Sequence, residues 1–349
     1  MAGALALLAP GFARAAAASP VPPVLHGTSA AVLDAYTGQL LYSVNGQTRY
    51  PMASTTKMMT ALVALKLLHD NPSRVVVVPP QVSQAYGNLL YLQPGTRYTF
   101  GQLLEGMLLP SANDAAIAVA VDAAGSLTRF VSLMNAEAAN LGLSDTHYAN
   151  PDGLESPDHY SSADDLARLG LAAMQDPLFR QTVRLPEATI PWPGHTPNTR
   201  VIGNINLLLS TFPGANGIKT GYTPQALNIA VGSVTRNGRS VIGVVMGESK
   251  WSLWPDEDAL LRYALAIAPP GAGGAGAPPP VHSPAGEITA RIVPARSPSP
   301  VPLFQQGAGW SPRGLVEWVA GLPLALVLVA FVFRLVARPR RRVPRFVRF

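Results

Sequence analysis

A serine and a lysine three positions apart are the first residues in this chain whose types and spacing could do chemistry. Ser54 and Lys57 enclose two threonines and stand at the start of an apolar stretch with helical periodicity. If Ser54 opens that helix, Lys57 lies one turn further along the same face. A serine hydroxyl becomes a nucleophile when an adjacent base takes its proton. Burial or a second cation can lower a lysine pKa enough to provide that base. The alternative is an ordinary helix cap followed by a surface lysine.

A second short segment offers a hydroxyl and an amide. Ser111, Ala112 and Asn113 follow an apolar run at residues 103–109 and a proline. The Ser111 hydroxyl could pass a proton between Lys57 and a leaving amine. The Asn113 amide could hold Lys57 and the peptide backbone of a substrate in place. Taken alone, the segment is equally compatible with a helix cap.

A third segment combines a cation, a hydroxyl and a glycine. Lys219, Thr220, Gly221 and Tyr222 stand between a turn at residues 216–217 and a stretch with strand character. On an edge strand, Lys219 and Thr220 could bind a substrate carboxylate, one by charge and one by a hydrogen bond. Gly221 would let a substrate backbone approach closely, and the Tyr222 N–H could form half of an oxyanion hole. The alternative is a lysine in a turn.

The rarity of lysine in this chain supports a functional role for Lys57 and Lys219. The chain has 22 arginines and only four lysines, at positions 57, 66, 219 and 250. Arginine stays protonated, whereas a buried lysine can lose its proton and act as a base. A lysine kept in so arginine-rich a chain is therefore a candidate for a role that arginine cannot fill.

Together, the three segments resemble the D-alanyl-D-alanine carboxypeptidase family of low-molecular-mass penicillin-binding proteins. The wider superfamily carries Ser-x-x-Lys, Ser-Asp-Asn and Lys-Thr-Gly motifs in this order. The resemblance covers nearly all of residues 25–268. The matching stretches are residues 51–61, 108–116, 150–154, 159, 162–167, 206–208 and 217–223.

Three positions depart from the pattern of the family. Asn216 replaces the usual aspartate ahead of the lysine motif, and Leu227 stands where the family tends to have glycine. Ile205 occupies a position where an arginine is often found, which puts one distal substrate contact in doubt.

The resemblance implies a serine acyl-enzyme fold of the penicillin-binding and β-lactamase type. This is an α/β (α+β) fold with an antiparallel sheet flanked by helices and an all-helical insertion that carries Ser111 and Asn113. The substrate it implies is the D-Ala-D-Ala end of a peptidoglycan stem peptide, and β-lactams are expected to be covalent inhibitors. No cofactor and no metal are expected.

The resemblance also implies a role for each residue. Ser54, deprotonated by Lys57, would attack the penultimate carbonyl of the stem peptide. The N–H groups of Ser54 and Tyr222 would hold the oxyanion, while Ser111 relays the proton to the departing D-Ala. Lys219 and Thr220 would bind its carboxylate, and water would then release the acyl-enzyme.

Other functions and other candidate residues remain open alternatives. A β-lactamase of the same fold usually needs a dedicated acid, for which Glu155 is the candidate, and a DD-endopeptidase or a catalytically idle scaffold is also compatible. The family pattern makes His159 structural. Asp164 and Asp165 are expected to cap and flank a helix rather than to form an acid pair. No cluster of His, Asp and Glu has convincing zinc spacing.

Periodicity places these residues on an antiparallel sheet with helices between its strands. Two β-type runs joined by a Tyr-Thr-Gly turn predict one hairpin, and two runs flanking Asn-Gly predict a second. A helix over residues 54–69 is expected to bury one face, made of Met58, Leu62, Leu65 and Leu68. The predicted strands are residues 30–35, 39–43, 228–234 and 240–246, and the further helices are residues 114–124, 127–141, 163–174 and 257–267.

The distribution of charge argues against a nucleic-acid-binding protein. The formal net charge is +6, but residues 25–268 hold 15 Lys and Arg against 18 Asp and Glu. Seven arginines and no acid follow from position 334 onward, so the basic balance belongs to the C-terminal end. Nucleic-acid binding needs a basic face on the folded domain. The absence of cysteine excludes disulfides, thiol catalysis and thiolate metal sites.

Composition divides the chain into five parts. Residues 1–20 are predicted to be a signal peptide, although no Lys or Arg precedes its apolar core. Residues 25–268 form the expected DD-peptidase catalytic domain, and residues 269–313 a Pro/Gly-rich linker. Residues 314–337 are predicted to form a transmembrane helix and residues 338–349 a basic cytoplasmic tail. We therefore expect a single-pass protein of the cell membrane with its catalytic domain outside the cytoplasm.

Overall fold

The computed structural model describes residues 20–249 and 251–270. The predicted linker beyond residue 270, the transmembrane helix, the basic tail and almost all of the signal peptide lie outside these residues. Within the described part, no single helix is both long enough and apolar enough to cross a membrane.

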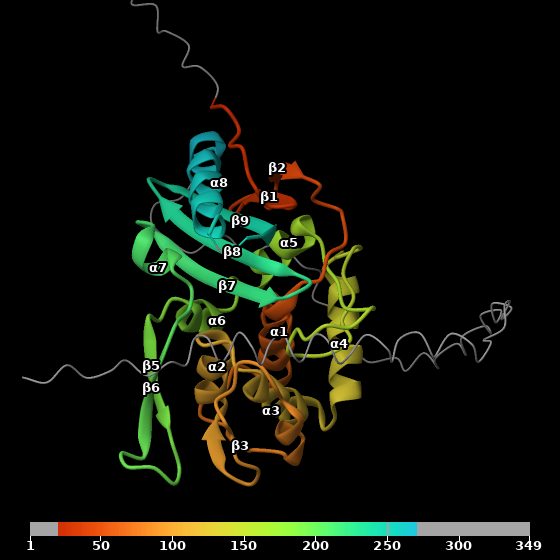
Figure 1. Cartoon of the computed structure of the whole chain (residues 1–349), viewed down its shortest axis with the longest axis vertical. Coiled ribbons are helices and arrows are strands. Elements are labelled where there is room, and N and C mark those ends of the chain that lie inside the picture. Colours follow the sequence, from red (N-terminus) through yellow and green to blue (C-terminus); the bar gives the residue numbers. More distant parts are fainter. Residues whose placement is uncertain (1–19, 250, 271–349) are drawn as a thin grey trace, which may run out of the picture. The chain divides into compact units, whose positions relative to one another are not determined.

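A five-stranded antiparallel sheet connects the two ends of the catalytic part (Figure 1). Its strand order is β2-β1-β9-β8-β7, so the first strand pairs with the last. Both predicted hairpins are confirmed, and β7 forms one edge of the sheet. The strands are β1 (Ser29–Asp34), β2 (Leu40–Val44), β7 (Ala215–Thr223), β8 (Leu227–Arg236) and β9 (Arg239–Glu248).

Both faces of the sheet are covered, which explains why its strands read as continuous apolar runs. Side chains alternate between the faces with a period of two. In β9, Val241 and Val245 pack into the core beneath α8 (Leu253–Ile267). Ile242 and Val244 pack into the opposite core, together with residues of α1 and α5. Helix α8 begins four residues earlier than the sequence predicted.

The helical insertion surrounds a central helix. The helices are α1 (Thr56–Leu68), α2 (Phe100–Leu108), α3 (Asn113–Ala124), α4 (Leu127–Asn140) and α5 (Ala163–Ala173). Every residue of α1 from position 56 to 65 is buried, so the prediction of a single apolar face was wrong. Helices α3, α4 and α5 all pack against α1, which leaves it no solvent-facing side over this stretch.

Two small sheets lie outside the main one and were not predicted. Strands β3 (Val75–Val77) and β4 (Arg97–Thr99) form one, and β5 (Glu187–Pro191) and β6 (Thr199–Gly203) form the other. The insertion is therefore not entirely helical. These strands have three to five residues with a single buried side chain each, so they carry little periodic signal. The remaining short helices are η1 (Ala53–Thr55), η2 (Pro80–Gln84), α6 (Pro177–Val183) and α7 (Leu208–Thr211).

Candidate active site

Ser54 lies in the short 3-10 turn η1 that leads directly into α1. Its neighbour Ala53 has a left-handed backbone (φ +47°), and the Thr56 hydroxyl donates a hydrogen bond of 2.7 Å to the Ala53 carbonyl. Gly153 packs behind this turn, where a Cβ atom would stand 2.1 Å from the Ala53 carbonyl oxygen and 2.9 Å from the Ser54 nitrogen. Only glycine fits there, so the turn that carries Ser54 is held from both sides.

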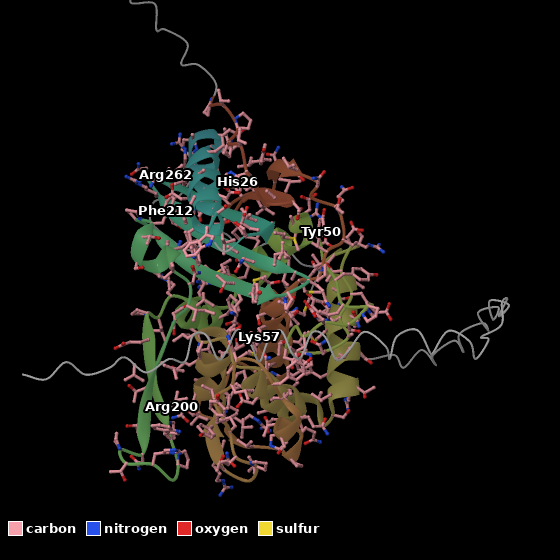
Figure 2. The ribbon with its side chains drawn as sticks, in the orientation of Figure 1. His26, Tyr50, Lys57, Arg200, Phe212 and Arg262 are labelled. Atoms are coloured by element: carbon pink, nitrogen blue, oxygen red, sulfur yellow. The ribbon has the colours of Figure 1, made fainter. Side chains whose placement is uncertain are left out.

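The Lys57 amine is the centre of the polar contacts around this turn. Its Nζ lies 2.9 Å from Ser54 Oγ and 2.7 Å from Asn113 Oδ1, and it also donates to the Asp152 carbonyl. The side chain is fully buried where the sheet meets the helical insertion (Figure 2). Burial lowers the pKa of Lys57 to about 8, although the negative charges of Asp152 and Asp114 oppose the shift. A neutral amine at this position can accept the proton of the Ser54 hydroxyl.

Asn113, the first residue of α3, connects Lys57 to the wall of the site. Its Oδ1 accepts from Lys57, while its Nδ2 donates to the Tyr86 carbonyl at 2.6 Å. The neighbouring Asp114 carboxylate accepts the backbone N–H groups of Leu90 and Leu92, both at 2.9 Å. These bonds fix the loop between η2 and β4 against the site.

Ser111 sits in the connection between α2 and α3 with a left-handed backbone (φ +68°). Its Oγ is buried and has no hydrogen-bond partner within the described part of the chain. A hydroxyl in this state is available to a group that enters the cavity, because a buried polar atom gains from any partner it finds.

Strand β7 runs past the turn of Ser54 with almost no space between them. A Cβ atom on Gly221 would stand 3.0 Å from the Ser54 nitrogen and 3.0 Å from Ala53 Cβ. Lys219 is buried, and its Nζ donates to the Thr220 carbonyl at 3.0 Å. Burial, and secondarily the charge of Lys57, holds the pKa of Lys219 well below its ordinary value.

All eight predicted site residues come together here from three separate segments. Six of them line a cavity of about 390 Å³: Ser54, Ser111, Asn113, Thr220, Gly221 and Tyr222. The other two, Lys57 and Lys219, lie behind this wall with side chains closed to solvent.

Several cavity residues were not predicted as part of the site. Asp152 contributes through its carbonyl oxygen, which any residue type could supply. Asn88, Leu253 and Trp254 line the cavity from the η2–β4 loop and from the start of α8. The match of residues 150–154 to the family was a usable signal for Asp152, but nothing local marked the other three.

The other acids and the histidine considered from the sequence lie outside the cavity. His159 Nε2 is 2.7 Å from Thr56 Oγ1, and its Nδ1 accepts the Ala149 N–H at 3.0 Å. Burial lowers the pKa of His159 to about 4, so it is a neutral, structural residue as expected. The Glu155 carboxylate accepts the Gln225 N–H at 2.9 Å.

Asp164 and Asp165 do not form an acid pair. Asp164 accepts from the Ser43 hydroxyl at 2.8 Å, whereas Asp165 accepts from Thr146. They occupy the first turn of α5, whose N-cap is Ser162 rather than either aspartate.

The structure shows the conformation or contacts of the three residues that depart from the family pattern. Leu227 has a left-handed backbone (φ +56°), which explains why glycine is favoured at this position. Asn216 Nδ2 donates to Thr235 Oγ1 at 2.9 Å, next to the β7–β8 ladder. Ile205 lines the cavity and is 45% exposed, so that part of the wall is apolar where an arginine was considered.

The Lys57→Arg substitution should abolish acylation of Ser54, because a guanidinium cannot accept the hydroxyl proton. The matched control is Lys66→Arg at the far end of the same helix, where the amine forms an ion pair with Glu137. This control should acylate like the unaltered chain. Stopped-flow measurements with a fluorescent penicillin give both rates, and a Lys57→Arg rate within tenfold of the control would contradict the assignment.

The chain is similar to known D-alanyl-D-alanine carboxypeptidases. A family model described as D-alanyl-D-alanine carboxypeptidase matches residues 15–250. The D-alanyl-D-alanine carboxypeptidase DacB2 of Mycobacterium tuberculosis is 38% identical over 244 residues, which is 68% of this chain and 82% of that protein.

Two solved structures have the same fold. One is the D-alanyl-D-alanine carboxypeptidase of Mycobacterium tuberculosis, with a TM-score of 0.67 at 36% identity over 72% of this chain and 96% of the other. The Streptomyces K15 DD-transpeptidase also gives a TM-score of 0.67, at 30% identity over 71% of this chain and all of the other. The chain therefore belongs to the D-alanyl-D-alanine carboxypeptidase family of serine peptidases.

Proposed function

We propose that this chain is a serine-type D-alanyl-D-alanine carboxypeptidase that removes the terminal D-Ala from peptidoglycan stem peptides. The observation that carries this function is the buried Lys57 amine within hydrogen-bond distance of both Ser54 Oγ and Asn113 Oδ1. Membership of the family supplies the substrate class, and the cavity beside β7 has room for the end of a peptide.

Acylation begins when Lys57 takes the proton of Ser54 as Oγ attacks the carbonyl carbon of the penultimate residue. A new C–O bond forms, and the carbonyl electrons move to oxygen. The backbone N–H groups of Ser54 and Tyr222 are assigned to this oxyanion. Their closeness follows from Gly221, which lets β7 approach the Ser54 nitrogen.

The leaving group departs when the C–N bond breaks and its nitrogen takes a proton. In this proposal, the proton passes from the Lys57 ammonium through the Ser111 hydroxyl, which is buried and has no other partner among the described residues. The charge of Lys219 and the hydroxyl of Thr220 hold the carboxylate of the departing D-Ala. Lys57 then takes a proton from water as the water attacks the ester carbonyl, the acyl C–O bond to Ser54 breaks, and Lys57 returns the proton to Ser54 Oγ.

The β-lactamase alternative lacks a suitably placed acid. Glu155 accepts a backbone hydrogen bond from Gln225 and does not line the cavity of Ser54. The acid that does line it, Asp152, accepts from the Leu154 N–H at 3.2 Å through its carboxylate. Glu155, the acid considered for fast hydrolysis of a penicillin ester, is therefore not placed to act at Ser54.

The Ser54→Ala variant should lose both the covalent penicillin adduct and the release of D-Ala, since the attacking oxygen is gone. Intact-protein mass spectrometry should show one added penicillin on the unaltered chain and none on the variant. Ser132→Ala is the matched control, because that exposed hydroxyl donates to the Thr128 carbonyl within α4. It should behave like the unaltered chain.

Incubation of the same proteins with muropeptides, followed by analysis of the products, distinguishes carboxypeptidase, endopeptidase and transpeptidase activity. Loss of one alanine per stem supports carboxypeptidase activity. Cleavage of crosslinked dimers without that loss would indicate an endopeptidase, and joining of stems to an added amine would indicate a transpeptidase. An adduct that persists in Ser54→Ala would refute the nucleophile.

We also propose that residues 1–20 direct export and that residues 314–337 anchor the chain in the membrane. Residues 319–333 are uncharged and mostly apolar, and the arginines that follow favour the cytoplasmic side. Residues 269–313 would then tether the catalytic domain, residues 25–268, within reach of the wall.

Protease added to intact spheroplasts should therefore cut the linker and release an active catalytic fragment. A tag placed after Phe349 should stay protected until the membrane is opened, because the positive-inside rule keeps it in the cytoplasm. Immunoblotting for the tag measures this directly. Digestion of the tag from outside would reverse the proposed topology.

A further inference from the structure

One imidazole and two carboxylates meet where the N-terminal segment reaches the start of α8. His26, Glu248 and Asp256 each offer one ligand atom, and these atoms lie within 4.8 Å of one another. His26 precedes β1, Glu248 ends β9 and Asp256 lies in the first turn of α8. Figure 2 labels His26 beside this helix. None of the three lines the cavity of Ser54.

The Asp256 carboxylate is held in one orientation. Its Oδ2 accepts the backbone N–H groups of His26 at 2.5 Å and Gly27 at 3.2 Å. Its Oδ1 lies 3.0 Å from His26 Nδ1. The backbone bonds occupy one oxygen and leave the other facing the imidazole, in the direction where a shared ligand would lie.

The Glu248 carboxylate is incompletely satisfied. The residue is only 1% exposed, and its Oε1 accepts the Ser249 N–H at 2.6 Å. Its Oε2 is buried and has no hydrogen-bond partner in the described residues. A buried carboxylate oxygen without a donor is costly, and a second carboxylate nearby adds repulsion. A cation bound between the two would remove both penalties.

We propose that His26, Glu248 and Asp256 form a binding site for a divalent cation of the zinc type. One imidazole nitrogen and two carboxylate oxygens belong to the ligand set that Zn²⁺ takes, and two negative charges balance the ion. With metal–ligand bonds of about 2.1 Å in tetrahedral geometry, ligand atoms lie roughly 3.4 Å apart. His26 Nδ1 and Asp256 Oδ1 already lie 3.0 Å apart, and the 70% exposed His26 side chain has freedom to adjust its position.

A cation bound at this position would connect two distant parts of the chain. It would join the chain ahead of β1 to α8, across a sequence separation of 230 residues. Leu253 and Trp254 line the cavity of Ser54, and in the sequence they lie between Glu248 and Asp256. The Asn228 side chain, which also lines the cavity, donates to the Glu248 carbonyl at 3.0 Å. Metal binding would therefore stiffen the part of the cavity wall formed by Asn228, Leu253 and Trp254.

The test is zinc binding by the full chain, purified in detergent without a histidine tag and freed of metal with a chelator. Isothermal titration with ZnCl₂ should show one site, and Tm should rise by several degrees. His26→Gln keeps a hydrogen-bond donor for Asp256 but removes the imidazole ligand. It and Glu248→Gln should each weaken zinc binding at least tenfold. CaCl₂ should bind more weakly than ZnCl₂, because calcium prefers oxygen ligands.

His195→Ala is the matched control, since it removes another exposed imidazole, one stacked on Trp192 in the β5–β6 turn. It should bind zinc like the unaltered chain. Tm in metal-free buffer shows that each variant is folded. Absence of zinc binding, unchanged affinity in His26→Gln, or an equal loss in His195→Ala would overturn the site. Because binding is measured rather than peptide cleavage, this result is independent of the proposed function.

Discussion

The enclosure of one lysine amine is the interaction on which the site depends. Lys57 Nζ is surrounded by Ser54 Oγ, Asn113 Oδ1 and the Asp152 carbonyl, in a place that no solvent reaches. The three partners supply hydrogen bonds but no full charge, and burial outweighs the negative charges of Asp152 and Asp114, so the amine holds its proton weakly. The same side chain in water would remain an ammonium near neutral pH and could not activate a hydroxyl.

The rest of the fold encloses that amine and holds the Ser54 turn in place. Helix α1 is enclosed by its neighbours over its first ten residues, so Lys57 enters the site from a rigid, buried element. Gly153 and Gly221 let two other segments pack closely against the Ser54 turn. Since β7 is an edge strand, its outer side is left for an extended substrate to align with.

Much of this arrangement could be predicted from the sequence, because its chemistry depends on residue type. The three motifs identified the segments that meet, and Asn-Gly and alternating apolar residues identified the hairpins. The hydrogen bond from Lys57 to the Asp152 carbonyl could not be predicted, since every residue carries a backbone carbonyl and residue type gives no signal for it. The full burial of α1 was also missed, because enclosure by three helices is a property of the tertiary structure. For the same reason, the contact between His26 and Asp256, which are 230 positions apart in the sequence, could not be predicted.

The scarcity of lysine makes the central claim directly measurable. With only four lysines in the chain, selective labelling at Nζ gives a spectrum with few signals, and Lys57→Arg assigns one of them. Titration by NMR should show Lys57 losing its proton near pH 8, since burial lowers its pKa to about 8. A Lys57 signal that stays protonated above pH 10 would contradict the account, because Ser54 would then have no base.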